Sequence, residues 1–240
     1  MTGWARVWLL VLALIAASVA FVAFPAVDLA VSGLFFDGTA FPVEANRGIE
    51  AIRLALYAAE DLAAAVTLGL AILTARRGLA ILRLGARDWF YAFGVFALGP
   101  GLLVNGILKP VFGRARPFQV EAFGGPAPFT QAWAICDRCQ GNKSFVSGEV
   151  AGAVALAIMF GMILVANRAA LGRAGWRLGW IAIAALPLFT AWQRIAAGRH
   201  FLSDVVLAAL MTALVATILA RQFYPAKARA SAVDFPRDSP

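Results

Sequence analysis

Apolar residues in this sequence gather in long stretches, separated by shorter segments in which polar and charged residues predominate. Each stretch is about 20 residues long, the length of helix that crosses a hydrocarbon core of roughly 30 Å. The stretches predict six membrane-spanning helices, at residues 4–24, 52–74, 89–108, 146–166, 176–195 and 202–223. No segment alternates polar and apolar residues as the strands of a membrane barrel do. The pattern therefore predicts an all-α, polytopic membrane protein whose six helices form one bundle.

Composition agrees with this pattern, because 62% of the 240 residues are hydrophobic and only 14% are charged. Soluble domains contain about a quarter charged residues. We expect residues 1–225 to form one transmembrane domain and residues 226–240 to form a disordered cytoplasmic tail. The first helix has an alternative interpretation as a cleaved signal peptide, since its start is basic and alanines follow its apolar run. Cleavage would leave the later topology unchanged.

The formal net charge of +8 indicates how the bundle is oriented. In a soluble protein such a charge would suggest a nucleic-acid partner. In a membrane protein, basic loops mark the cytoplasmic face, so we expect no nucleic acid to bind. With six helices, the following basic residues all fall on one side: Arg6, Arg76, Arg77, Arg83, Arg87, Arg168, Arg173, Arg177, Arg221, Lys227, Arg229 and Arg237. Both termini are therefore predicted to be cytoplasmic in a bacterial inner membrane, and residues 25–50, 109–145 and 197–200 to face the periplasm.

Polar residues of three segments converge on the predicted periplasmic ends of the helices. They are Lys109, Arg114, Arg116, Ser144, Ser147, Gly148, Glu149, Gln193, Arg194, Arg199, His200 and Asp204. Guanidinium groups bind phosphate oxygens in pairs, and a lysine adds a point charge. The backbone N–H groups of Ser147 and Gly148, at a helix start, also attract anions. Together these segments predict a phosphate-binding site at the periplasmic face.

His200 is the only histidine in the chain and precedes Asp204 by four residues. This spacing puts both side chains on one helix face, where the carboxylate can fix the tautomer of the ring and stabilise the imidazolium. The other ring nitrogen can then attack phosphorus and form a phosphohistidine. A histidine at a helix start is otherwise a simple polar terminus, but the neighbouring cations favour the catalytic interpretation. We expect no metal and no cofactor, since Lys and Arg supply the positive charge.

These residues resemble the three signatures of the type 2 phosphatidic acid phosphatase superfamily, which also contains vanadium haloperoxidases. The matching motifs are Lys109-x6-Arg116-Pro117, Ser147-Gly148 and Arg194-x5-His200-x3-Asp204. The resemblance implies a phosphate cradle of five residues, namely Lys109, Arg116, Ser147, Gly148 and Arg194. It also implies that His200 is the nucleophile and that Asp204 orients it.

Two positions depart from the family pattern. Glu149 stands where the family usually has a histidine that protonates the leaving oxygen, and Gln193 stands where it usually has a serine. Glu149 could replace that acid if burial favoured its protonated form; alternatively it offsets the helix dipole or pairs with an arginine. The run 136–149 and the stretch 28–42 are similar to bacterial lipid A 4′-phosphatases, a subgroup in which Ser-Gly-Glu replaces Ser-Gly-His.

Two further pairs of residues have weaker claims to a role. Cys136 and Cys139 have C-x-x-C spacing. Outside the cytoplasm this spacing favours a small structural disulfide, with free thiols and redox catalysis as alternatives. Glu60 and Asp61 lie inside the second predicted helix, where ionisable residues are functional candidates by default. They either pair with an arginine of a neighbouring helix, which is the favoured interpretation, or face the site.

The sequence therefore predicts a membrane phosphatase that removes a phosphate from a lipid, with a lipid A-like substrate favoured. Phosphatidylglycerophosphate, phosphatidic acid and undecaprenyl pyrophosphate are alternative substrates, because the motifs recognise only the phosphate. A non-catalytic protein that binds or transports a lipid phosphate is an alternative of another class. The expected partners are the phosphorylated lipid and the bilayer, with no obligatory protein partner.

Overall fold

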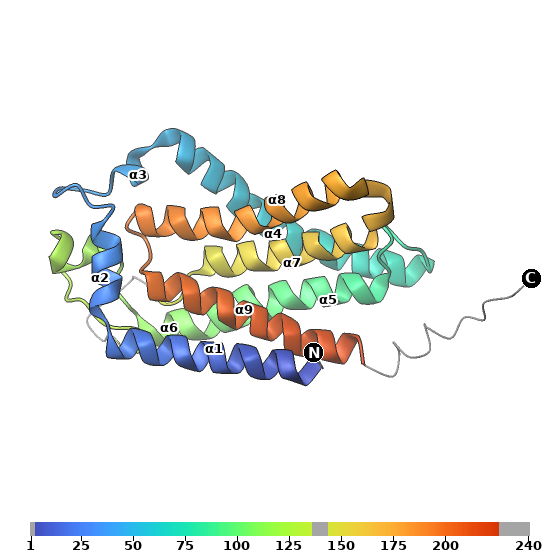
Figure 1. Ribbon diagram of the computed structural model, residues 1–240, viewed down its shortest axis with the longest axis horizontal. Helices are drawn as coiled ribbons and strands as arrows, with labels where there is room; N and C mark the ends of the chain where they lie inside the picture. Colours follow the sequence, from blue (N-terminus) through green and yellow to red (C-terminus); the bar gives the residue numbers. More distant parts are fainter. Residues whose placement is uncertain (1–2, 136–143, 226–240) are drawn as a thin grey trace, which may run out of the picture.

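The computed structural model describes residues 3–135 and 144–225 of the chain (Figure 1). In this part of the chain six helical spans are long and apolar enough to cross a membrane. They comprise α1 (Gly3–Ala23), α4 (Arg47–Arg77), α5 (Ala86–Phe96) continued by η1 (Ala97–Leu108), α7 (Gly148–Ala166), α8 (Arg168–Ala196) and α9 (Leu202–Phe223). The described residues form no strand. The prediction of an all-α, polytopic membrane protein is confirmed.

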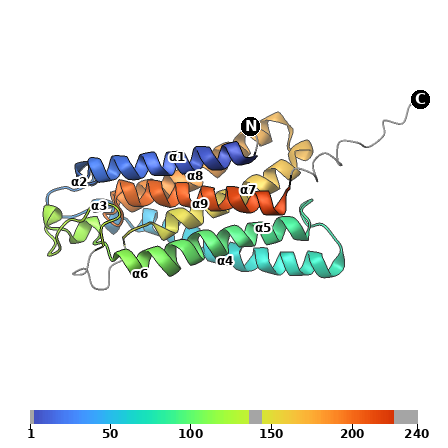
Figure 2. The same ribbon diagram turned by 90° about the horizontal axis from the view of Figure 1, so that it is seen from below.

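The long helices lie roughly along one common direction, with α7 inside the bundle (Figures 1 and 2). α7 packs against α4, α5, η1, α8 and α9, whereas α1 packs mainly on α9. Large apolar side chains of α1, such as Trp8, Leu12 and Val19, are consequently exposed on the surface. A surface of this kind suits contact with lipid.

Among the helix starts that differ from the prediction, those of α4, α7 and α8 have local features that account for them or accompany them. α4 begins at Arg47 because the Asn46 side chain caps it, accepting hydrogen bonds from the N–H groups of residues 48 and 49. α7 begins at Gly148, since Ser147 is its N-cap and accepts a bond from the Val150 N–H. α8 begins at Arg168 and contains a non-helical residue, Gly172, with φ 61°. A left-handed φ of this kind favours glycine, so α8 consists of two helical pieces.

The third span has an unusual middle. After α5 the backbone widens into the π-helix η1, which contains Pro100, and it closes again in α6 (Lys109–Phe112). The Asn105 side chain donates a hydrogen bond of 2.8 Å to the Pro100 carbonyl. Proline lacks an N–H and disturbs a regular helix, and π-turns are frequent at functional sites. The wide turn ends directly before Lys109.

One end of the bundle, here called the site end, is covered by short elements. These are α2 (Ala26–Gly33), α3 (Pro42–Ala45), η2 (Pro117–Gln119) and η3 (Glu121–Phe123). Figure 1 shows α2 and α3 lying beyond the ends of the long helices there. The predicted Cys136–Cys139 disulfide and the predicted tail at 226–240 lie outside the described residues, so they and the domain boundary at 225 stay predictions.

Candidate functional site

Backbone hydrogen bonds hold the three predicted polar segments together at the site end. The Ser147 N–H donates to the Asp204 carbonyl (3.1 Å), which joins the start of α7 to the start of α9. The Ser144 N–H donates to the Arg114 carbonyl (2.9 Å). This bond joins the segment just before α7 to the loop after α6. The Phe118 N–H donates to the Gly198 carbonyl in the turn before α9 (3.1 Å). The predicted convergence of distant segments is therefore present.

His200 lies in the turn between α8 and α9 and is only 3% exposed. Its Nδ1 atom is 3.6 Å from Asp204 Oδ2 and 3.4 Å from Ser144 Oγ. The Ser144 hydroxyl itself donates a bond of 2.5 Å to the same Asp204 oxygen. Asp204 and Ser144 thus hold the Nδ1 side of the ring, which leaves Nε2 as the nitrogen that can react.

The surroundings of His200 favour the neutral imidazole over the imidazolium. Burial lowers the pKa of His200, the hydrogen bond and charge of Asp204 oppose this shift, and the charges of Arg116 and Lys109 add to it. A neutral imidazole retains the lone pair that a nucleophile needs. The same charges show that His200 lies within electrostatic reach of two predicted phosphate-binding cations.

Asp204 is anchored by a buried network that extends well beyond His200. Arg114 donates to Asp204 Oδ1 (2.8 Å) and to Asp28 Oδ2 (2.8 Å), and the two carboxylates thereby share one guanidinium. Ser203 donates both its N–H (2.8 Å) and its hydroxyl (2.6 Å) to Asp28. The Phe201 N–H donates to Asp204 Oδ2 (2.9 Å). Because the charged members are at most 1% exposed, this network fixes the carboxylate that faces His200.

Sequence reasoning missed Asp28 and Ser203 and gave Arg114 no role of its own. Arg114 and Arg116 are two residues apart, yet their surroundings differ: Arg114 points into the buried network, and Arg116 lines a cavity. One signal was available for Asp28, since a carboxylate in a largely apolar segment needs a buried partner. Its partner, 86 positions away along the chain, could not be identified from local sequence.

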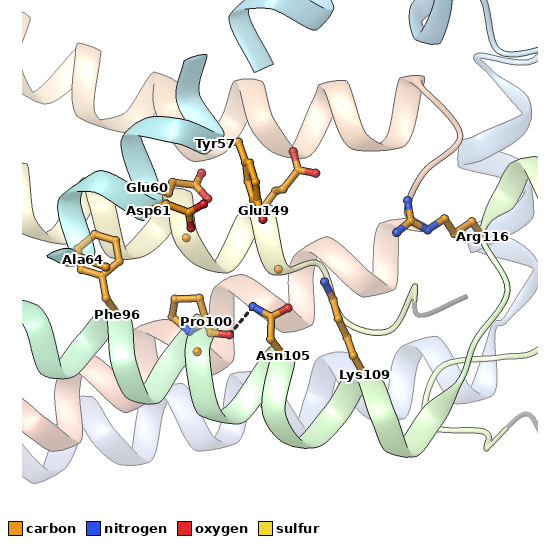
Figure 3. A pocket seen from close by; sticks show the side chains of 13 residues that line it. Tyr57, Glu60, Asp61, Ala64, Phe96, Pro100, Asn105, Lys109, Arg116 and Glu149 are labelled. Atoms are coloured by element: carbon orange, nitrogen blue, oxygen red, sulfur yellow. Dashed lines mark hydrogen bonds between the residues drawn. The ribbon is translucent and has the colours of Figure 1, made fainter. Parts of the chain in front are cut away.

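A cavity of about 340 Å³ opens between α4, η1 and α7 (Figure 3). Lys109, Arg116, Gly148 and Glu149 line it, so four predicted site residues lie around one cavity. A Cβ atom at Gly148 would stand 2.8 Å from Lys109 Nζ and 2.9 Å from Asn105 Oδ1. Glycine at this position therefore lets the lysine reach the N-terminus of α7, where an anion is favoured.

The other predicted site residues lie behind the cavity wall. His200, Asp204, Ser147 and Arg194 are buried and are not among the cavity-lining residues. The Ser147 hydroxyl caps α7 by accepting from the Val150 N–H at 3.3 Å. In this state a phosphate in the cavity would meet Lys109, Arg116 and the N-terminus of α7 before it reached the imidazole.

Glu149 connects the cavity to Arg194. Its Oε1 accepts a bond of 3.0 Å from Arg194, and both its oxygens lie 3.2 Å from Arg53 Nη1. Arg53 also pairs with Glu50 at 2.6 Å. The Gln193 amide oxygen accepts from Arg194 Nε at 2.5 Å, so the unusual glutamine positions the arginine. Of the sequence alternatives for Glu149, the structure contains the pairing with arginine; Arg53 was missed, because it lies within the predicted second helix.

Glu60 and Asp61 require a correction. The sequence favoured their pairing with an arginine of a neighbouring helix. No arginine forms an ion pair with either carboxyl group in the part of the chain that the structure describes, and both residues line the cavity instead. The favoured interpretation was wrong because hydropathy indicates that α4 spans a membrane but not which neighbouring helix faces residue 60. Within the described ranges, no cluster of three or more His, Cys, Asp or Glu is arranged to hold a metal ion.

Comparisons with known proteins agree with the motifs. The model of the PAP2 superfamily matches residues 89–228. The lipid A 4′-phosphatase of Rhizobium leguminosarum is 32% identical over 81% of this chain and 86% of its own length. That of Rhizobium etli is 32% identical over 81% and 78%, and that of Francisella tularensis subsp. novicida is 34% identical over 45% and 46%. No solved structure matches the chain significantly.

Proposed function

Because the chain belongs to the PAP2 superfamily, we propose that it removes a phosphate from a lipid A-like substrate through a phosphohistidine at His200. The protein is a membrane lipid phosphatase, a phosphoric monoester hydrolase. The observation that carries the mechanism is the placement of His200 against Asp204, within reach of the charges of Lys109 and Arg116. Binding alone would need the cations but no oriented imidazole.

The proposed reaction has two steps. The lone pair of His200 Nε2 attacks phosphorus, the bond between phosphorus and the lipid oxygen breaks, and that oxygen takes up a proton. Water then attacks the phosphohistidine, the P–N bond breaks, and inorganic phosphate leaves. Lys109, Arg116, Arg194 and the N–H groups at the start of α7 stabilise the charge on the equatorial oxygens. Asp204 stabilises the imidazolium that exists while phosphorus is bonded to the ring.

Glu149 is proposed as the proton donor to the leaving oxygen. It lines the cavity next to Gly148, on the side where a phosphate would compete for Arg194. A phosphate bound to Arg194 would replace Glu149 as a partner of that guanidinium. Glu149→Gln should then lower turnover and change its pH profile, measured as phosphate release. A lowered turnover with an unaltered profile would leave Glu149 as a structural partner of Arg53 and Arg194.

We assign the site to the periplasmic face of the bacterial inner membrane. Arg76, Arg77, Arg168 and Arg221 lie in the helix ends opposite the site. Basic residues at membrane-flanking positions favour the cytoplasm. The arginines of the site end, in contrast, are largely engaged by carboxylates, as Arg114 and Arg194 illustrate. The proposed orientation thus rests on this difference in arginine pairing between the two ends of the bundle.

Phosphate release tests the proposal directly. Purified wild-type protein in detergent should release inorganic phosphate from lipid A and leave a product lighter by one phosphate group, whereas His200→Ala should be inactive but folded. Since the chain has a single histidine, any acid-labile phosphate trapped on the wild-type protein should be absent from this variant. Phosphatidic acid, phosphatidylglycerophosphate and undecaprenyl pyrophosphate serve as comparison substrates. Equal release by His200→Ala would refute the nucleophile.

A further inference from the structure

The cavity continues along α7 beyond its cationic part. Gly148 and Gly152 are one turn apart on the same face of α7, about 6 Å along the axis at 1.5 Å per residue. Lys109 Nζ lies against Gly148, and the carboxyl group of Glu60 lies against Gly152, where any Cβ atom would collide with it. Figure 3 shows Glu60 and Asp61 on α4 at one end of the cavity and Lys109 and Arg116 toward the other.

Glu60 has no partner that accounts for its position. It is 6% exposed, it lines the cavity, and it forms no hydrogen bond or ion pair within residues 3–135 and 144–225. A buried carboxyl group within a membrane span is unfavourable unless its polar atoms are satisfied. Because its oxygens face the cavity, the group that satisfies them is whatever fills the cavity.

The chemistry around Glu60 indicates which occupant fits. Asp61 and the Tyr57 hydroxyl line the same region, and Phe96 contributes an aromatic ring. Carboxyl oxygens accept hydrogen bonds from hydroxyl and amide N–H groups. An acyl chain in this place would leave those oxygens unsatisfied, which is strongly unfavourable. The volume is within the range of small-molecule sites, and the wall suits a polyhydroxylated ring rather than a hydrocarbon tail.

We propose that Glu60, assisted by Asp61, binds the saccharide to which the phosphate is attached and so selects a phosphorylated glycolipid over phosphatidic acid. This inference rests on the proposed function. The cavity that begins at the N-terminus of α7 extends to Gly152, one helical turn away, and so offers room there for a ring attached to a phosphate bound at that terminus. Hydroxyl and amide groups of that ring then meet Glu60, whereas the diacylglycerol of phosphatidic acid brings ester groups and chains that donate no hydrogen bond.

The test compares two substrates in the same mixed micelles. Lipid A and phosphatidic acid are each assayed for kcat/KM by release of inorganic phosphate, with wild type, Glu60→Gln and Glu60→Leu. Glu121→Gln is the matched control, because Glu121 is an exposed carboxylate of η3 outside the cavity. Glu60→Leu fills the position with an apolar side chain, and its thermal unfolding is measured beside the kinetics to establish that it folds.

We expect Glu60→Leu to reduce the ratio of kcat/KM for lipid A to that for phosphatidic acid by about 10-fold or more, the effect of losing a hydrogen bond to a buried group. Glu60→Gln should give a smaller reduction, and Glu121→Gln the wild-type ratio. An unchanged ratio in both Glu60 variants, including equal losses on both substrates, would overturn saccharide recognition. Wild-type protein inactive on both substrates would overturn the proposed function as well.

Discussion

Arg114 is a cation shared by two buried carboxylates, those of Asp28 and Asp204. Removing it would leave both acids without compensation, and breaking a buried ion pair in this way typically costs about 3–5 kcal/mol. We expect Arg114→Ala to lower the free energy of unfolding by about that amount and also to lower turnover, because Asp204 would lose its anchor. Thermal or denaturant unfolding of the detergent-solubilised protein measures the first effect.

Arg116→Ala is the control for that prediction. Arg116 lines the cavity, and its buried Nε atom has no hydrogen-bond partner in the described part of the chain. Its removal should therefore reduce turnover while the unfolding midpoint stays close to that of wild type. Similar unfolding midpoints for the two variants would contradict the buried role assigned to Arg114.

His200 should titrate below the range of free histidine. Burial lowers the pKa of its imidazole, so the ring loses its proton at a lower pH than the usual midpoint of about 6.5. The neutral nucleophile then persists as the pH falls through 6.5, and the acidic limb of kcat/KM lies below that value. Because the chain has one histidine, ¹⁵N-histidine labelling gives a single ring to follow by NMR. A midpoint at or above that of free histidine would contradict the assignment.

At the scale of single residues, motif spacing predicted which residues lie at the site but not which partners they contact. Lys109, Arg116 and Gly148 line one cavity. His200 lies beside Asp204, but it does so from the turn before α9 and not from a shared helix face as the i,i+4 spacing predicted. Asp28 could not be predicted, because only folding brings it to Arg114. Their catalytic and phosphate-binding roles remain predictions that the variants above test.

At the scale of elements, two glycines of α7 should respond differently to substitution by alanine: one change should lower activity and the other should not. A methyl group at Gly148 would displace Lys109 Nζ and Asn105 Oδ1, both ends of flexible side chains. Gly148→Ala should therefore change stability little but reduce kcat/KM by about 10-fold or more, the scale of one lost charged hydrogen bond. Phosphate release from the lipid substrate measures the loss.

Gly161→Ala is the matched control in the same helix. A Cβ atom there would make ordinary contact with the Trp180 ring at 3.5 Å. Alanine is preferred over glycine inside a helix by about 1 kcal/mol, so this variant should retain activity and equal or exceed wild type in thermal stability. Equal loss of activity in both variants would show that α7 tolerates no added methyl group. It would contradict the inference that Gly148 is needed to leave room for Lys109.

Hydropathy predicted best the helices that contact lipid on one side and pack on the bundle on the other, because both surroundings require apolar side chains. α9 has the predicted bounds, and α1 is displaced by one residue at each end. α2 was not predicted because eight residues are too short to show a helical period within a segment read as a loop. The π-helical turns of η1 were equally invisible, since the sequence marks Pro100 but not how the backbone adjusts around it.

At the scale of the whole molecule, the bundle presents two chemically different ends. One end holds the cavity and the ion-pair networks, and the other holds the arginine-rich helix ends. If the positive-inside rule sets the orientation, α2 and α3 cover a periplasmic site, and the lipid substrate approaches it from the periplasmic leaflet. Hydropathy and charge predicted two such ends, because both act on whole helices and loops rather than on individual contacts; the orientation itself stays a prediction.

Thiol labelling tests the orientation with two alanines at opposite ends. Ala40 precedes α3 at the site end, Ala80 follows α4 at the other end, and both are exposed. In a background with Cys136 and Cys139 changed to serine, Ala40→Cys should react with a membrane-impermeant maleimide in intact spheroplasts. Ala80→Cys should react only after the membrane is permeabilised. The reverse pattern would place the site in the cytoplasm, where it would meet lipid of the other leaflet and a different set of phosphorylated substrates.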